Sequence, residues 1–228
     1  MYLSFVKMPR DMFDKRKKDV LGKLDKSNIG QWDEKIIPLC KKLNSKKNFY
    51  TTSSCAGRVI LLIDSEKKAP NLFLYVAHDK INFKNLKKKL NEIIQNIPPQ
   101  TLIDFVSCKR SPTPKKLSVI PKSSSKSLNS KNINFKQEPC GLHIACRNLE
   151  DAQILLDKAR KAGWKKSGII SSKKRFIIEM FGTNKLEFPI IRNGKILVDD
   201  SFLKIIVKTS NKNIEKSWKQ IKSLGKVV

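Results

Sequence analysis

NFYTTSSCAGRVILLID, residues 48–64, contains two strand-like runs separated by a turn of small and polar residues. The first run, 48–54, combines aromatic and β-branched side chains, which favour strands. The second run, 58–64, is apolar on both faces, as expected of a strand at the centre of a sheet. A third run, LFLYVAH at 72–78, follows closely. Three strands so near one another predict a β-rich body in the first half of the chain.

Helical periodicity flanks this β-rich body. Residues 13–25 predict one helix, and a second is expected to be capped by Asp33 and bent by Pro38, which together give an N-terminal helical pair. The remaining predicted elements are helices at 83–96, 149–162 and about 200–224, and strands at 101–107, 141–147, 174–181, 185–191 and 195–198. Gly163 is expected to end the second of these helices, and tight turns are expected at Ser167-Gly168 and Gly182-Thr183. We therefore predict an α+β fold with mixed β-sheets and packed helices. No G-x-G-x-x-G follows a strand, so a Rossmann-type glycine motif is not indicated.

One basic stretch interrupts the predicted elements. From 109 to 136 there is no acidic residue, but there are eight Lys and Arg, three prolines and a run of serines. Such a segment has too few apolar side chains to bury itself. We expect a single domain over residues 1–228 with a mobile basic insertion at about 109–134. A solvated insertion is the favoured interpretation of this segment, and an arm that contacts a nucleic-acid partner is the alternative.

The composition points to an anionic partner. The 228 residues carry 48 Lys and Arg against 20 Asp and Glu, a formal net charge of +28. A field of this size attracts polyanions such as nucleic acid. No apolar run approaches the roughly 18 residues of a membrane span, and the N-terminus has no secretory signal. The five cysteines are odd in number and are interpreted as reduced, so we predict a cytoplasmic protein.

Two motifs carry candidate chemistry. The turn at 51–58 offers hydroxyl groups, backbone N–H groups and Arg58, which could bind an anion; a purely structural polar turn is an equally good interpretation.

Cys140, His143 and Cys146 have the spacing of metal ligands. Strand alternation places the two cysteines on one face and His143 on the other, so we predict no metal site there. His143 is then free to form a hydrogen bond or transfer a proton. Glu179 lies inside an apolar strand, where an acid is costly to bury unless it is paired, so we expect it to be either an edge-face residue or functional.

The order of several motifs resembles a known family. These are DKSNIGQWD at 25–33, YTTSSCAGR at 50–58, VAH at 76–78, FKQEPCGLHIACRNLEDAQILLDKARKAGWKKSGI at 135–169 and EMFGTNKLEFPI at 179–190. Together they resemble the N4-methyltransferases of wybutosine and wyosine synthesis. The resemblance implies S-adenosyl-L-methionine as methyl donor. It also implies phenylalanine tRNA as substrate, methylated on N4 of the tricyclic base derived from guanosine 37. The basic charge independently fits a tRNA partner.

The resemblance gives the candidate residues their predicted roles. The acceptor nitrogen carries a proton, so a base near it would help, and the candidates are Glu179, Glu138, His143 and Asp33. The cofactor-binding candidates are Ser53, Ser54, Arg58, Ser167, Gly182 and Thr183, of which Ser53, Ser54 and Arg58 would hold the cofactor carboxylate or an RNA phosphate. The alternative function is a non-catalytic, basic RNA-binding protein. Binding of S-adenosyl-L-methionine distinguishes the two.

Overall fold

A computed structural model describes residues 10–23, 33–65, 72–95, 132–172 and 175–228. The described part of the chain forms five helices and nine strands. The helices are α1 (Arg10–Leu21), α2 (Ile37–Asn44), α3 (Phe83–Gln95), α4 (Leu149–Lys161) and α5 (Asp200–Val227). The strands are β1 (Phe49–Cys55), β2 (Arg58–Ile63), β3 (Phe73–Ala77), β4 (Ile133–Glu138), β5 (Gly141–Cys146), β6 (Lys166–Ser171), β7 (Phe176–Phe181), β8 (Leu186–Arg192) and β9 (Lys195–Ile196).

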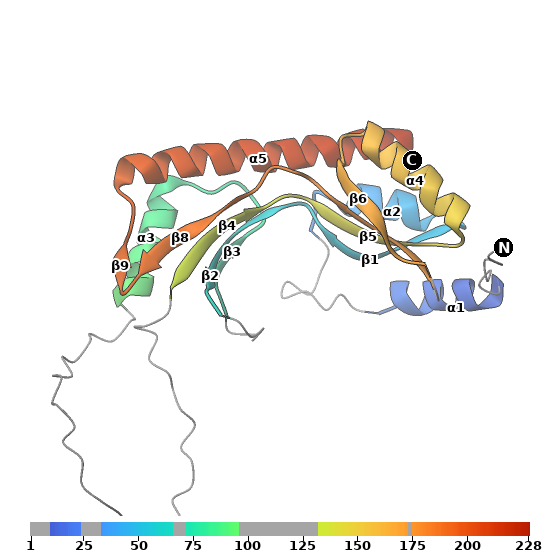
Figure 1. The fold of residues 1–228 in the computed structure, drawn as a ribbon, viewed down its shortest axis with the longest axis horizontal. Helices are drawn as coiled ribbons and strands as arrows, with labels where there is room; N and C mark the ends of the chain where they lie inside the picture. The colour runs from blue at the N-terminus through green and yellow to red at the C-terminus, as the bar shows by residue number, and fades with distance from the viewer. Residues whose placement is uncertain (1–9, 24–32, 66–71, 96–131, 173–174) are drawn as a thin grey trace, which may run out of the picture.

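The strands form two sheets that together make an arch. One sheet has the order β1-β5-β7-β6 and the other β3-β2-β4-β8-β9, with every neighbouring pair antiparallel. The chain crosses between the sheets three times, from β1 to β2, from β4 to β5 and from β7 to β8. Figure 1 shows α2, α3, α4 and α5 on the convex side of the arch and α1 on the concave side. The predicted α+β fold is confirmed, although the two N-terminal helices lie on opposite faces of the sheet.

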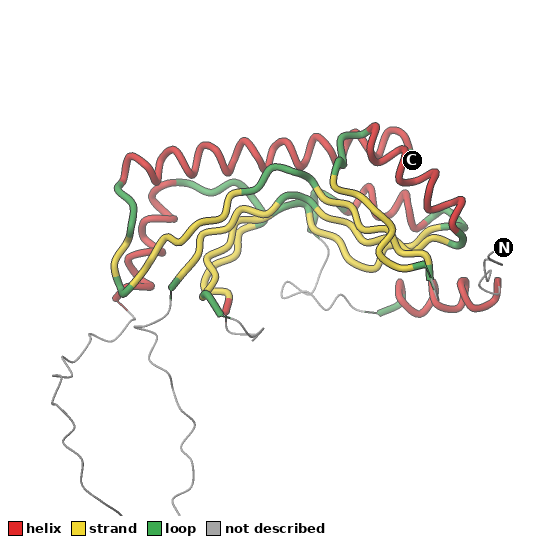
Figure 2. The backbone as a smooth tube through the Cα atoms, viewed as in Figure 1, coloured by secondary structure: helices red, strands yellow, loops and turns green. Residues whose placement is uncertain are grey.

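Each sheet has its own core on the convex side. Ile144 and Ile178 face α2 and α4 in one cluster, and Leu61 and Phe135 face α3 in the other. The long helix α5 spans both, and its Trp218 packs against both clusters. Figure 2 shows this helix running along the whole length of the arch. Burial against α5 therefore ties the two sheets into one unit.

Polar residues on the buried face of α5 bond to the chain near the crossings. The Asn213 amide donates to Gln137 at 2.8 Å, and the backbone N–H of Cys140 donates to Ser217 Oγ at 3.2 Å. Ladder hydrogen bonds stop where a strand leaves its sheet, so buried backbone groups there need other partners. This explains why a helix core contains Asn and Ser at i, i+4 spacing.

The structure corrects two predictions about element boundaries. Asp33 does not cap α2, which begins at Ile37 with Pro38 in its first turn, so Pro38 does not bend the helix. Residues 133–134 of the predicted insertion begin strand β4. In this strand the side chains at 133, 135 and 137 are buried and those between them are half-buried. The alternation with period two is typical of a strand, and it was not recognised in the sequence. The predicted strand at 101–107 and residues 109–131 of the insertion lie outside the described residues.

Three smaller predictions also change. Ser167 and Gly168 lie inside strand β6 rather than in a turn, and Gly182-Thr183 lies in the connection that crosses from β7 in one sheet to β8 in the other. Helix α5 continues through Gly225 and ends at Val227, beyond the predicted end at about 224. The predicted helix stop at Gly163 is confirmed by a φ of 92°. None of the described helices has the length and apolar character needed to cross a membrane.

Candidate functional site

A row of site candidates crosses the concave face of the first sheet. Ser53 pairs with His143, His143 with Glu179, and Glu179 with Gly168, so one line runs across β1, β5, β7 and β6. A β-bulge between Thr51 and Ser53 sets this register. Because the bulge adds one residue, Ser53 rather than Thr52 stands opposite His143.

His143 and Glu179 form a hydrogen-bonded pair at the centre of this row. The Nε2 of His143 lies 2.8 Å from Oε1 of Glu179, and the side chains are 32% and 37% exposed. The Phe181 ring meets the His143 ring edge-on at a centroid distance of 5.9 Å and covers Gly141, where a Cβ would lie 2.4 Å from the ring. Glu179 thus has a partner on the neighbouring strand, and the pair remains accessible from the concave side.

Arg58 and Glu138 form a second pair, where the chain crosses from β1 to β2 and from β4 to β5. They are directly opposite each other on β2 and β4, and Arg58 Nε donates to Glu138 Oε2 at 2.7 Å. The guanidinium also lies 5.6 Å from the centroid of the Phe73 ring, which is 37% exposed on the same side. Arg58 thus presents a cation next to an exposed aromatic ring.

Asp33, Cys55 and His78 meet at the edge of the same crossing. Asp33 Oδ2 lies 3.1 Å from His78 Nδ1 and accepts a hydrogen bond from Ala56 N–H at 3.0 Å. The Asp33 side chain is 7% exposed and that of His78 22%. The hydrogen bond to Asp33, followed by one to Cys55, raises the pKa of His78 from 6.5 to about 9, so the ring is protonated at neutral pH.

These three side chains are also the group whose donor atoms could hold a metal ion among the described residues. The carboxylate, thiol and imidazole atoms lie within 4.8 Å of one another. They are ligand types that Zn²⁺ accepts, although a protonated imidazole must first lose its proton. That the protein holds no metal stays a prediction.

The alternation argument for Cys140, His143 and Cys146 is confirmed. Both cysteines are buried in the convex-side core, whereas His143 faces the concave side. Burial raises the pKa of Cys140 to about 12 and also raises that of Cys146. The third buried cysteine, Cys40 on α2, has its pKa raised by burial to about 11. Cys55 alone of the four described cysteines is not buried.

Several predicted site residues lie away from the concave row. Ser54 pairs with the buried Leu142 and bonds to Cys40, so it faces the convex side. Ser167 Oγ donates to the Trp164 carbonyl at 2.6 Å. Gly182 and Thr183 lie at the crossing, where a Cβ on Gly182 would be 2.9 Å from Pro139. Ser54, Ser167 and Gly182 therefore do not share a surface with His143 and Glu179.

His78 is the functional candidate that reasoning from the sequence did not assign to the site. It directly follows strand β3 in the other sheet, 45 residues from Asp33, and only the fold brings the two together. The VAH motif at 76–78 was the available signal, because it is part of the family pattern.

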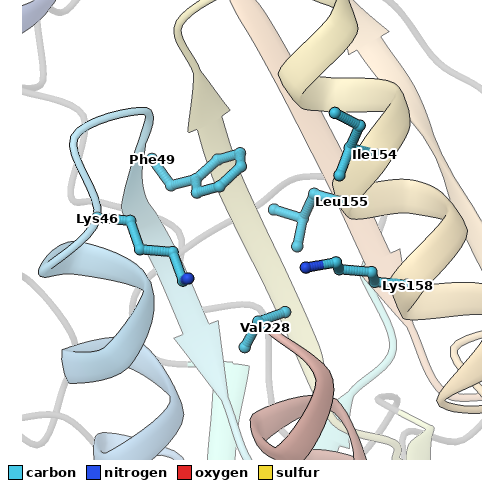
Figure 3. Close-up of a pocket in the computed structure, with 6 residues that line it drawn as sticks. All are labelled: Lys46, Phe49, Ile154, Leu155, Lys158 and Val228. Carbon is cyan, nitrogen blue, oxygen red and sulfur yellow. The ribbon is translucent and has the colours of Figure 1, made fainter.

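A small pocket on the convex side is separate from these groups. Figure 3 shows it between the end of α2, strand β1, helix α4 and the end of α5. Its lining residues are Lys46, Phe49, Ile154, Leu155, Lys158 and Val228. None of them belongs to the concave row.

Comparisons with known proteins identify the family of this chain. A tRNA wybutosine-synthesizing protein 3 homolog from Danio rerio is 28% identical over 221 residues, covering 94% of this chain and 73% of its own length. A tRNA(Phe) 7-((3-amino-3-carboxypropyl)-4-demethylwyosine(37)-N(4))-methyltransferase from Methanocaldococcus jannaschii is 32% identical over 197 residues, covering 82% and 81%. The structure of the PH1069 protein from Pyrococcus horikoshii superposes with a TM-score of 0.72 at 26% identity, covering 99% of this chain and 97% of that one. The family model described as Methyltransferase TYW3 matches residues 15–228, and the chain therefore belongs to this methyltransferase family.

Proposed function

We propose that this methyltransferase transfers a methyl group from S-adenosyl-L-methionine to N4 of the tricyclic wyosine-type base at position 37 of phenylalanine tRNA. The family supplies the reaction class, and the name of the Methanocaldococcus jannaschii relative supplies the acceptor. The concave face is the part of the described structure where candidate bases, a cation and hydroxyl groups lie together.

The observation that carries this proposal is the accessible pair His143–Glu179 at the centre of the concave row. Before methylation, N4 carries a proton that must leave as its lone pair forms the new N–CH₃ bond. The imidazole of His143 can accept this proton on one ring nitrogen while the other stays bonded to Glu179, which stabilises the resulting imidazolium. The electron pair of the broken S–CH₃ bond remains on sulfur.

The other two candidate bases fit this role less well. Glu138 already accepts a hydrogen bond from the Arg58 guanidinium at 2.7 Å, so this carboxylate has a partner of its own. Asp33 is nearly buried and already accepts hydrogen bonds from His78 and Ala56. Both carboxylates are better suited to orienting their partners than to taking a proton from the substrate.

The chemistry of the concave face fits the methyl donor. S-adenosyl-L-methionine, when bound, supplies a methyl group on a positively charged sulfur. Arg58 and the protonated His78 offer cations for its carboxylate, and Ser53 offers a hydroxyl. The exposed apolar side chains of Phe73 and Val76, 37% and 38% exposed, offer a surface for the adenine ring. Holding donor and acceptor together would supply much of the rate acceleration.

A transfer assay with two tRNA substrates tests the proposal. Protein is mixed with methyl-labelled S-adenosyl-L-methionine and phenylalanine tRNA that carries either the 4-demethyl tricyclic base or unmodified guanosine at position 37. We expect label in the first tRNA only, together with saturable binding of S-adenosyl-L-methionine in calorimetry. Binding of both tRNAs without methyl transfer or cofactor binding would instead support the non-catalytic RNA-binding alternative.

A further inference from the structure

Arginine is scarce in this chain and its placement is uneven. The sequence contains forty Lys and eight Arg, so most cationic surface positions are Lys. Six of these Arg have described side chains, and four of the six lie on the concave face or on helix α1, which covers one end of it: Arg16, Arg58, Arg147 and Arg175. In such a Lys-rich chain, Arg at a position suggests a need for its planar guanidinium.

Two of these four guanidiniums have structural partners. Arg58 bonds to Glu138. Arg147 bonds to both carboxylate oxygens of Asp14 and to the Lys47 carbonyl, and it stacks on the Phe13 ring at 4.5 Å. These contacts explain why Arg rather than Lys stands at both positions.

Arg16 and Arg175 have no such explanation. Both side chains are exposed, and within the described residues neither forms a hydrogen bond or ion pair through its guanidinium. On helix α1, Asp14 bonds to Arg147. Asp19, the other acidic residue near Arg16 on this helix, forms no ion pair with it within the described residues. Two unpaired guanidiniums are therefore available to an outside anion.

The fold brings these two side chains to one place. Helix α1 is docked on the concave face by Phe13, whose ring lies 5.1 Å from that of Tyr50 and against Ala145. Arg16 is one helical turn from Phe13. Arg175 directly precedes β7 and continues the concave-facing alternation of Ile177 and Glu179. Both guanidiniums are close enough to the buried Tyr50 hydroxyl to lower its pKa, against a larger rise from burial.

We propose that Arg16 and Arg175 form a binding site for a backbone phosphate of the RNA substrate at the α1 end of the concave face. This inference rests on the proposed function. Arg175 is four strand residues from Glu179, or about 13 Å along β7. A stacked strand advances about 3.4 Å per nucleotide, so the bound phosphate lies about four nucleotides from the base at His143 and Glu179. The site would hold the anticodon loop while its modified base enters the concave face.

Binding measurements on matched arginine variants test this site. The variants are Arg16→Ala, Arg175→Ala, the double variant and the two Arg→Lys variants, with Arg160→Ala as control. Arg160 is exposed on α4, a helix on the convex side, and the substitution Arg160→Ala removes the same charge. The probe is phenylalanine tRNA with the 4-demethyl base, titrated by fluorescence anisotropy from 50 to 200 mM salt, and cofactor binding is measured by calorimetry.

We expect the double variant to lose affinity for the tRNA by roughly tenfold and the Arg160→Ala control by less than twofold. The slope of log K against log salt should become shallower by about 0.7–0.9, the value for one lost phosphate contact. The Lys variants should keep the slope but bind more weakly than wild type, because an ammonium cannot form the bidentate contact. Cofactor binding should not change in any variant.

Two results separate this inference from the proposed function. If wild-type protein methylates the tRNA but the double variant binds it as the Arg160→Ala control does, the phosphate site is wrong and the function stands. If wild-type protein neither binds cofactor nor methylates this tRNA, the proposed function itself fails. Circular dichroism and melting temperature verify that each variant is folded.

Discussion

Replacing Glu179 by Gln should reduce methyl transfer far more than it reduces stability. The substitution keeps the shape of the side chain and its hydrogen bond to His143 but removes the negative charge. A hydrogen bond to a charged group is worth about 1.5–3 kcal/mol, and this bond strengthens when His143 takes the N4 proton. The loss of that energy in the transition state corresponds to about a ten- to hundredfold slower methyl transfer. Because both side chains are about one-third exposed, the pair should add at most about 1 kcal/mol to folding.

The assay is single-turnover methyl transfer at saturating cofactor and tRNA, combined with melting temperature on the same preparation. The matched control is Glu187→Gln, because Glu187 also faces the concave side and forms an ion pair there with Lys136. We expect the control to transfer methyl within about twofold of wild type. If Glu179→Gln does so too, or if both variants lose the same factor, the pair His143–Glu179 does not handle the proton.

Three further predictions concern the surroundings of the site. A pKa of His78 raised from 6.5 to about 9 stabilises the protein fully below pH 6.5, so up to about 3 kcal/mol should be lost as pH rises from 6.5 through 9; Asp33→Asn should flatten this loss in melting curves between pH 6 and 10. Ser217→Ala should lower the free energy of unfolding by about 1–3 kcal/mol in urea titrations, because the buried N–H of Cys140 loses its acceptor, whereas the exposed Ser223→Ala should change it by less than 0.5 kcal/mol. Iodoacetamide at neutral pH should modify Cys55 before the three buried cysteines, as read by peptide mass spectrometry, and equal labelling of all four would contradict the burial described here.

The sequence predicted most elements because their patterns are local. The apolar run of β2, the helical stripe of α3 and the capped, glycine-terminated α4 each agree with the structure to within one or two residues. Strand β4 was missed because its buried and half-buried positions alternate within a segment whose lysines and asparagines indicate a loop. Strand β6 was missed because Ser167-Gly168 favours a turn, and its pairing with β7 overrides that local preference.

The candidate site was only partly predictable because it depends on long-range pairing. Alternation along β5 correctly placed His143 on the other face of the strand from the two cysteines, because that argument uses neighbouring residues alone. The partners of Arg58 and Asp33 are 80 and 45 residues away in sequence, and no local pattern identifies them. The same reason explains why His78 acquires a role only in the folded chain.

The turn at 51–58 had two interpretations, structural and functional, and the fold divides its residues between them. Thr51 bonds through its backbone N–H to Asn44 at 2.8 Å, which holds β1 against α2. Ala56 is fully buried at the crossing, and Gly57 has a φ of 103°, with Glu138 O only 3.2 Å from where a Cβ would lie. At these positions the chain requires small or buried residues to pass from one sheet to the other, whatever the protein does.

The remaining residues of this turn project to the concave side for a reason that also comes from the crossing. Ser53 and Cys55 share the alternation of β1 that pairs them with His143 and Gly141, and Arg58 begins β2 opposite Glu138. In an uninterrupted flat sheet these side chains would lie side by side along parallel lines, at fixed spacing. Because the strands bend at 56–57, side chains from both sheets approach one another on the inner side of the arch. The bend that requires Ala56 and Gly57 for packing is thus what leads the chain from Ser53, opposite His143, past Cys55, beside His78, to Arg58, which bonds to Glu138.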